Sequence, residues 1–126
     1  MRIESERLIV RSYSIDDLKS LNIDIPEYIT PATKYIPQMI EFVKGLEKKG
    51  YTYRIEDGIY FDVKSFPGYG QLSQKDLDKP GNARIEENAN KHHPFDFALW
   101  KFVPDNHIMK WDSPWGVGCP GWHIEC

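Results

Sequence analysis

Two successive apolar patterns in the middle of the chain leave few choices of fold. Apolar residues recur every three or four positions, at Ile36, Met39, Ile40, Val43 and Leu46. This spacing predicts an amphipathic helix that begins at about Thr33, tolerates Pro37 in its first turn and ends at Lys48-Lys49-Gly50. The segment from Tyr51 to Val63 then alternates in polarity around Glu56-Asp57-Gly58, which predicts a β-hairpin. The helix stripe and the hairpin would share one core.

The side chains of this hairpin also predict its register. A two-residue turn at Asp57-Gly58 would place Tyr53 opposite Asp62 and mix polar and apolar residues on each face. A three-residue loop instead gives one continuous apolar face. The pairs expected across that loop are Ile55 with Ile59, Tyr53 with Phe61, and Tyr51 with Val63. We therefore expect the three-residue loop, with Gly58 in a left-handed bulge conformation.

Weaker patterns flank the helix and the hairpin. Ser14 is a suitable N-cap for a short helix from Ile15 to Asn22, and the proline-containing stretch from Asp24 to Ala32 is expected to be a turn. The stretch from Ser73 to Asn90 is polar and is expected to be mobile. Apolar residues alternate again between Phe95 and Trp100, which predicts a further strand.

Composition limits the class of protein. A chain of 126 residues with 40% hydrophobic content can form one modest core, so residues 1–126 are expected to form a single domain. The net charge of -3 argues against a broad nucleic-acid surface. Since the sequence has no apolar run of about 20 residues and no leader-like start, we expect no membrane contact and a cytoplasmic location. Cys119 and Cys126 are close in sequence, which suits reduced thiols.

Potential chemistry is concentrated at the end of the sequence. The run Gly121-Trp122-His123-Ile124-Glu125-Cys126 brings together an indole, an imidazole, a carboxylate and a thiol, and it follows the aromatic run Trp111-Asp112-Ser113-Pro114-Trp115-Gly116. Aromatic residues in such glycine- and proline-rich loops need a pocket or a partner surface. Thiolate and imidazole are also ligands that zinc prefers, and Cys119, His123 and Cys126 form a C-x3-H-x2-C cluster.

This cluster has two readings. Three ligands with this spacing do not match the common structural zinc patterns, so ordinary unliganded residues are favoured over a closed local site. Alternatively, one of the cysteines contributes to a site that residues outside this chain complete. Other polar residues receive no catalytic role: His92-His93 is expected to lie in an exposed polar loop, and Asp57 and Asp62 are expected to be turn and surface carboxylates.

Long strings of residues resemble the cysteinyl-tRNA synthetase family in order and spacing. They are Pro94-Phe95-Asp96-Phe97-Ala98-Leu99-Trp100-Lys101, Trp111-Asp112-Ser113-Pro114-Trp115-Gly116 and Pro120-Gly121-Trp122-His123-Ile124-Glu125-Cys126. The helix that opens with Tyr35-Ile36-Pro37 and the strand around Asp57 to Val63 resemble the insertion inside the catalytic domain of this family. The resemblance covers about Ile15 to Cys126.

The resemblance implies an α/β fold, namely part of a Rossmann-like class I synthetase catalytic domain with an inserted helix and β-hairpin. Residues of about 15–110 would form the insertion-like part, and residues 111–126 would begin the second half of the catalytic fold. The implied activity is ATP-dependent activation of cysteine and its transfer to tRNA(Cys). Zinc would bind the substrate thiolate, because metal coordination discriminates between a thiol and a hydroxyl better than polar contacts do.

Carried over residue by residue, the resemblance makes Cys126 a zinc ligand and places Trp122 in the substrate pocket, with His123 in a supporting role. It assigns no catalytic residue and no ATP-binding residue, since the nucleotide-binding motifs and the other zinc ligands of the family have no counterpart in this sequence. Cys119 stands where the resemblance leads us to expect a basic residue.

Three hypotheses follow. The chain is a fragment of a cysteine–tRNA ligase, as an expressed piece or part of a split gene, and is inactive without the remainder of the synthetase. Alternatively, it belongs to a related cysteine ligase that uses a small amine as acceptor. In the third hypothesis it is a noncatalytic remnant or interaction module.

Overall fold

The computed structural model describes residues 2–4, 9–11, 14–25, 27–28, 30–74, 77 and 89–124. The chain divides into two compact units, Met1–Pro31 and Ala32–Cys126. None of the helices in the described ranges is both long and apolar enough to cross a bilayer.

The first unit contains a two-stranded antiparallel sheet and a short helix. Strand β1 (Arg2–Glu4) pairs with β2 (Ile9–Arg11), and helix α1 spans Ile15–Ser20. The prediction of a helix behind Ser14 is confirmed, although the helix ends two residues before the expected Asn22. Its first turn is fixed by the carboxylate of Asp17, which accepts hydrogen bonds of 2.7 Å from both the backbone N–H and the hydroxyl of Ser14.

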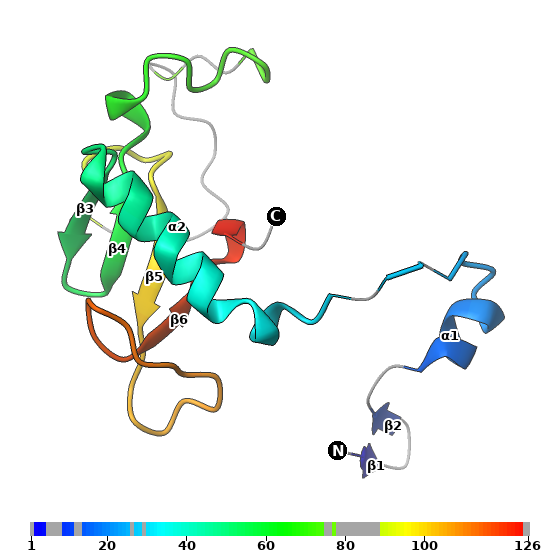
Figure 1. The fold of residues 1–126 in the computed structure, drawn as a ribbon. Coiled ribbons are helices and arrows are strands. Elements are labelled where there is room, and N and C mark those ends of the chain that lie inside the picture. Colours follow the sequence, from blue (N-terminus) through cyan, green and yellow to red (C-terminus); the bar gives the residue numbers. More distant parts are fainter. Residues whose placement is uncertain are drawn as a thin grey trace. The chain divides into compact units, whose positions relative to one another are not determined.

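The second unit is a four-stranded antiparallel sheet with one helix packed against it (Figure 1). After the 3-10 turn η1 (Ala32–Lys34) come helix α2 (Ile36–Lys48) and the strands β3 (Thr52–Ile55) and β4 (Gly58–Phe61). The 3-10 turn η2 (Val63–Ser65), strand β5 (Phe97–Phe102), strand β6 (Gly118–Pro120) and the 3-10 turn η3 (Trp122–Ile124) follow. The strand order is β3-β4-β5-β6, so neighbours in the sheet are also neighbours in the sequence.

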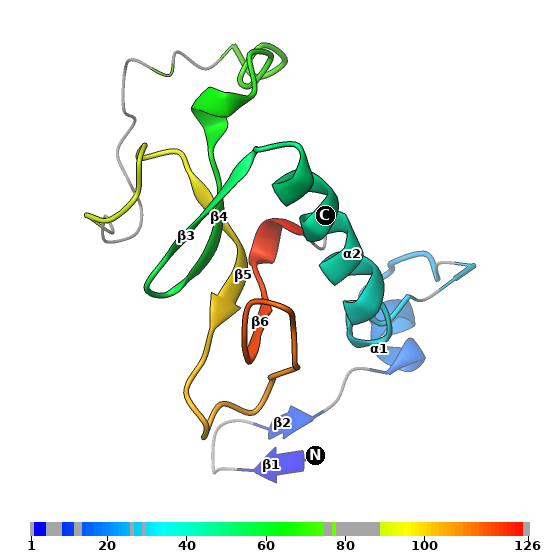
Figure 2. The ribbon, with the colours of Figure 1, turned by 60° about the vertical axis from the view of Figure 1, so that its left-hand side comes forward.

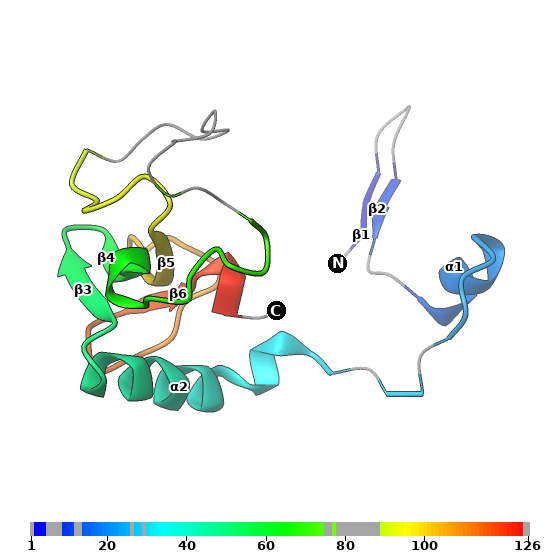
Figure 3. The ribbon, with the colours of Figure 1, turned by 90° about the horizontal axis from the view of Figure 1, so that it is seen from above.

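Helix α2 confirms the predicted apolar stripe. Ile36 and Val43 are buried, and the other three residues of the stripe, Met39, Ile40 and Leu46, pack against the core. The helix begins at Ile36, three residues after the predicted start at about Thr33, because Pro37 lacks an N–H and fits only the first turn. Its end is as expected: Gly50 has a φ of 77°, and the N–H of Tyr51 donates to the carbonyl of Leu46 across 3.1 Å. Figure 3 shows α2 running along one side of the sheet.

The core joins this helix to the sheet. Its buried apolar side chains are Ile36, Val43, Ile59, Phe61, Val63, Leu99, Trp100 and Trp115. Val43, Val63 and Trp100 are completely buried. Each such side chain contributes about 1.5–3 kcal/mol to stability.

The hairpin exists, but the predicted register is wrong. Ile55 lies opposite Gly58 and Tyr53 lies opposite Tyr60, so the turn has two residues, Glu56 and Asp57. The prediction assumed that one face of the hairpin meets water. Strand β4, which lies between β3 and β5, is instead buried at all four positions, so both of its faces are covered.

Gly58 has a different role from the expected one. It is not among the residues with positive φ. A Cβ atom at this position would lie 2.2 Å from the backbone oxygen of Trp100, so glycine is needed for the close approach of β5.

Strand β5 confirms the strand predicted between Phe95 and Trp100, although it starts at Phe97. Most of the stretch 73–90, which was predicted to be mobile, lies outside the described residues.

Candidate functional site

The turn η3 holds two of the site residues predicted from the sequence, Trp122 and His123. Strand β6 leads directly into this turn, and the N–H of Gly121 donates to the carbonyl of Leu99 across 2.8 Å. Trp122 is 83% exposed. The exposed ring of His123 meets the edge of Phe97, with 5.1 Å between the ring centroids. Both predicted side chains are therefore presented to the surface from the same short turn.

Two glycines allow this turn to lie so close to β5. A Cβ atom at Gly121 would be 1.9 Å from the backbone oxygen of Ala98, and one at Gly118 would be 2.2 Å from that of Lys101. Neither distance is possible for a real side chain. Glycine is thus required at both positions where the backbone passes along β6 into η3.

The loop between β5 and β6 (Figure 2) contains the aromatic run from Trp111 to Gly116. Ser113 to Gly116 form a tight turn, in which the N–H of Gly116 donates to the carbonyl of Ser113 across 3.1 Å. Pro114 suits its second position, and Gly116 provides a φ of 130°. The turn directs Trp115 inward, where its ring lies 6.1 Å from that of Trp100. The partner surface expected for this aromatic residue therefore lies within the chain itself.

Trp115 also reaches helix α2. Its indole Nε1–H donates to both carboxylate oxygens of Glu47, across 3.1 and 3.2 Å. These residues are 68 positions apart in the sequence, and no local pattern marked Glu47 as a partner of the tryptophan loop.

A buried carboxylate organises the segment before β5. Asp96 is only 3% exposed and accepts hydrogen bonds from the hydroxyl of Tyr53 and from the backbone N–H groups of Val63 and His93, all within 2.9 Å. The ring of His92 stacks on Tyr53 with 3.7 Å between centroids. Burial raises the pKa of the Tyr53 hydroxyl above its ordinary value, and the neighbouring carboxylate of Asp96 adds to the increase.

The expectation of an exposed loop at His92-His93 holds for His92 but is wrong for His93, which is 7% exposed. The Nδ1 atom of His93 accepts a hydrogen bond from the N–H of Phe95, and its Nε2 lies 3.0 Å from the carbonyl oxygen of Leu77. This pattern requires the proton on Nε2. His93 is buried because it completes the turn that Asp96 holds, and its position beside a proline did not reveal this.

The two aspartates that were expected to be turn and surface carboxylates have local structural contacts. Asp62 caps η2 by accepting from the N–H groups of Lys64 and Ser65. Asp57 accepts a hydrogen bond of 2.9 Å from the hydroxyl of Tyr60.

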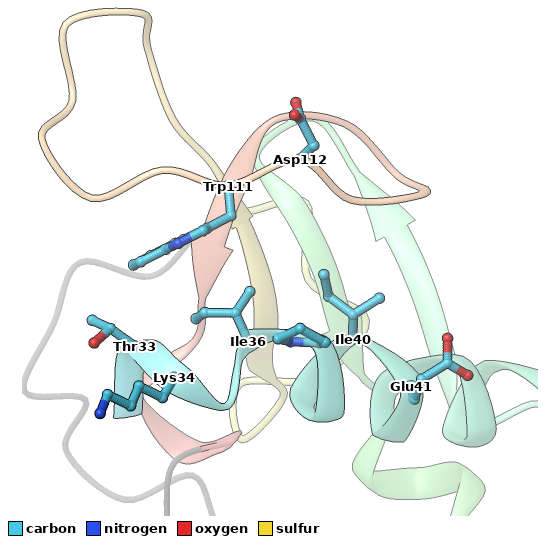
Figure 4. A pocket seen from close by; sticks show the side chains of 8 residues that line it. Thr33, Lys34, Ile36, Ile40, Glu41, Trp111 and Asp112 are labelled. Atoms are coloured by element: carbon cyan, nitrogen blue, oxygen red, sulfur yellow. The ribbon is translucent and has the colours of Figure 1, made fainter. Parts of the chain in front are cut away.

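A recess of about 550 Å³ lies between the start of α2 and the loop before β6 (Figure 4). Figure 4 shows the indole of Trp111 on one side and Ile36 and Ile40 on the other. The recess is lined by Thr33, Lys34, Ile36, Pro37, Ile40, Glu41, Trp111 and Asp112. It does not include Trp122 or His123, so it is separate from the turn that carries the predicted site residues.

The metal prediction depends on a residue that lies outside the described part of the chain, Cys126. Cys119 is half-buried on β6, opposite Lys101. Within the described ranges, no group of three or more histidine, cysteine, aspartate or glutamate side chains could hold a metal ion. The described residues therefore do not form a zinc site on their own.

Comparison with known proteins identifies the family. Residues 4–126 match the family model described as the catalytic domain of class I (C) tRNA synthetases. The chain belongs to this family. The resemblance to the cysteinyl-tRNA synthetases is thus confirmed, and the helices and antiparallel sheet represent part of an α/β class I synthetase catalytic domain.

Individual synthetases are similar over nearly the whole chain. The cysteine–tRNA ligase of Chlorobium luteolum is 45% identical over 126 residues, which cover 98% of this chain and 26% of that protein. The cysteine–tRNA ligase of Finegoldia magna is 44% identical over 125 residues, covering 98% of this chain and 27% of the relative. That of Thermus thermophilus is 46% identical over 112 residues, covering 88% and 23%. The chain thus spans about a quarter of the length of these synthetases.

Proposed function

We propose that this chain is part of a cysteine–tRNA ligase, an enzyme that activates cysteine with ATP and transfers it to tRNA(Cys). The main support is the match of residues 4–126 to the class I (C) catalytic domain, together with the similarity to proteins named cysteine–tRNA ligase. Since charged tRNA is used in protein synthesis, we further propose the cytoplasm as the place of action.

Within this proposal, η3 forms part of the surface that receives the amino acid. Trp122 would lie against the substrate and His123 would support the turn. The exposed indole of Trp122 is consistent with this role, because it leaves a large apolar ring available for contact with another molecule or segment. We propose residues 111–126 as the beginning of the second half of the catalytic fold, and residues of about 15–110 as the insertion-like part.

The proposal assigns zinc to a site completed by residues outside this chain, with Cys126 as one ligand. Within the described ranges no group of side chains could hold a zinc ion, and we therefore propose that residues outside those ranges supply the remaining ligands. The metal would supply selective binding of a thiolate.

A segment exchange tests the proposal. The aligned part of the Chlorobium luteolum ligase is replaced by this chain, and charging of tRNA(Cys) with radiolabelled cysteine is measured. We expect the exchanged protein to charge tRNA and to contain one zinc ion per molecule. Its Cys126→Ser variant should lose both zinc and charging. A folded exchange protein without charging activity, or a Cys126→Ser variant that keeps its zinc, would refute the assignment.

A further inference from the structure

Glu47 occupies a position that its own helix does not favour. It lies in the last turn of α2, where the exposed backbone carbonyls carry partial negative charge and basic residues are preferred. The next two residues, Lys48 and Lys49, follow that preference. Glu41, on the same helix, is instead paired with Lys44 across 2.7 Å. The reason for a carboxylate at position 47 must therefore lie outside the helix.

The partner of Glu47 is the tryptophan loop. Both carboxylate oxygens lie within 3.2 Å of Nε1 of Trp115, which gives the indole N–H a charged acceptor. Trp115 is only 8% exposed. The rotation of its ring is thus restricted by core packing on one side and by Glu47 at its N–H.

The contact continues from Trp115 to strand β6. The ring of Trp115 packs against that of Trp100, which is completely buried and lies opposite Pro120 in the sheet. A Cβ atom at Gly118 would lie only 2.5 Å from Nε1 of Trp100, so β6 lies directly against this indole. A change in the position of Trp115 would consequently reach β6 through Trp100.

Strand β6 in turn determines where the backbone of Trp122 lies. Because the indole of Trp122 is 83% exposed, few contacts hold the side chain itself, and its position depends on where the backbone of η3 lies. That backbone is attached to β5 by the hydrogen bond between Gly121 and Leu99.

From these contacts we infer that Glu47 is a positioning residue: through Trp115 and Trp100, it sets the orientation of the turn that carries Trp122 and His123. The inference rests on the proposed function only in so far as this turn receives the substrate. It thus assigns to α2 a role in orienting the amino-acid site, although the helix itself does not contact the amino acid.

Fluorine NMR of the 126-residue chain, labelled with 5-fluorotryptophan, tests the coupling without any need for activity. The four tryptophans give four resonances, which single Trp→Phe variants assign. We expect Glu47→Ala to shift the resonances of Trp115 and Trp122 and to broaden that of Trp122. The resonance of buried Trp100 should remain sharp, which shows that the core is folded. Glu41→Ala, at an exposed position of the same helix, should leave the resonance of Trp122 unchanged.

Two further variants separate the hydrogen bond from general destabilisation. Glu47→Gln keeps an acceptor oxygen and should restore most of the parent spectrum. Trp115→Phe keeps an aromatic ring but removes the donor, so it should shift Trp122 as Glu47→Ala does. The inference is overturned if Glu47→Ala affects Trp115 alone, or if Glu41→Ala shifts Trp122 equally.

The exchanged ligase described above provides the functional readout. Glu47→Ala should raise KM for cysteine by up to about tenfold, because a remote contact can pass to the substrate site at most about the free energy of one hydrogen bond to a charged group, and it should leave KM for ATP unchanged. An equal rise in both KM values, or no change in either, would contradict a positioning role. If the exchanged ligase is inactive, the proposed function fails, whereas the fluorine spectra still decide whether Glu47 orients the turn.

Discussion

The hydroxyl of Tyr53 donates a hydrogen bond of 2.8 Å to the carboxylate of Asp96 and thereby joins β3 to the residue directly before β5. These residues are 43 positions apart. The same carboxylate holds the N–H groups of Val63 and His93, so a single buried side chain fixes the two ends of the long connection between β4 and β5.

Replacement of Asp96 by asparagine should destabilise the second unit by about 3 kcal/mol, because an amide offers one acceptor oxygen to three donors and places an N–H₂ group against one of them. Urea unfolding measures the difference. The control is Asp105→Asn, at an exposed position, which should change the free energy of unfolding by less than about 0.5 kcal/mol. Equal effects of the two substitutions would show that Asp96 does not hold this connection.

The alkaline limit of stability should depend on Tyr53. Its pKa is raised in the folded chain, so the unfolded chain loses its tyrosine proton first as the pH rises above about 10. The stabilisation from the protonated hydroxyl is therefore complete below that pH and declines above it. We expect Tyr53→Phe to be less stable than the parent at pH 8, and the difference between them to shrink from pH 10 to pH 11.5. Melting temperatures that remain equally far apart would contradict this.

The position of α2 was predictable because its signals are local. An apolar stripe, a proline in the first turn and a Lys-Lys-Gly end all occur within one stretch of sequence, and each has one structural meaning. Only the start differs, since the residues from Ala32 to Lys34 form a 3-10 turn before the helix.

The hairpin register was not predictable from the hairpin alone. The choice between turns rested on keeping the apolar residues on one face, but β4 pairs with β5 and is buried at all four positions, so both of its faces are covered. Gly58 likewise carries no local sign that it faces the backbone of Trp100. The register depends on contacts with β5, which lies far away in the sequence. The alternation of polar and apolar residues within the hairpin does not reveal those contacts.

The roles of Trp122, His123 and Cys126 stay predictions. The structure places Trp122 and His123 on one surface turn, whereas Cys126 lies outside the described residues. Glu47 and Asp96 were missed because their partners are far away in sequence. A signal for Asp96 was present: an acidic residue stands between Phe95 and Phe97 in an apolar stretch, where only a hydrogen-bonded carboxylate is tolerated.

Substitution of glycine by alanine should destabilise the chain at Gly121, beside the sheet, and stabilise it at Gly45, within the helix. Gly121→Ala would place a Cβ atom 1.9 Å from a backbone oxygen and should detach η3 from β5, with a loss of several degrees in Tm. Gly45 lies within α2 and a Cβ atom there would meet nothing within 4 Å, so Gly45→Ala should stabilise the chain by about 0.5–1 kcal/mol. If Gly121→Ala melts like the parent, the close approach of β6 and β5 is wrong.

Substitutions at two neighbouring residues of α2 test which face of the helix packs against the core. Val43 is completely buried, and Val43→Asp should bury an unpaired charge and unfold the second unit. Phe42 is 61% exposed, and Phe42→Asp should retain the folded circular dichroism spectrum although it removes a larger apolar side chain. If Phe42→Asp unfolds the second unit and Val43→Asp does not, the helix packs against the core with another face.

Cysteine-dependent exchange of pyrophosphate into ATP is the most direct test of the central claim, because it measures amino-acid activation without any tRNA acceptor. The 126-residue chain alone should show no exchange. The Chlorobium luteolum ligase that carries this chain in place of its aligned segment should show exchange with cysteine and not with serine. If this chimeric ligase folds but fails to activate cysteine, the assignment of this chain to a cysteine–tRNA ligase is contradicted.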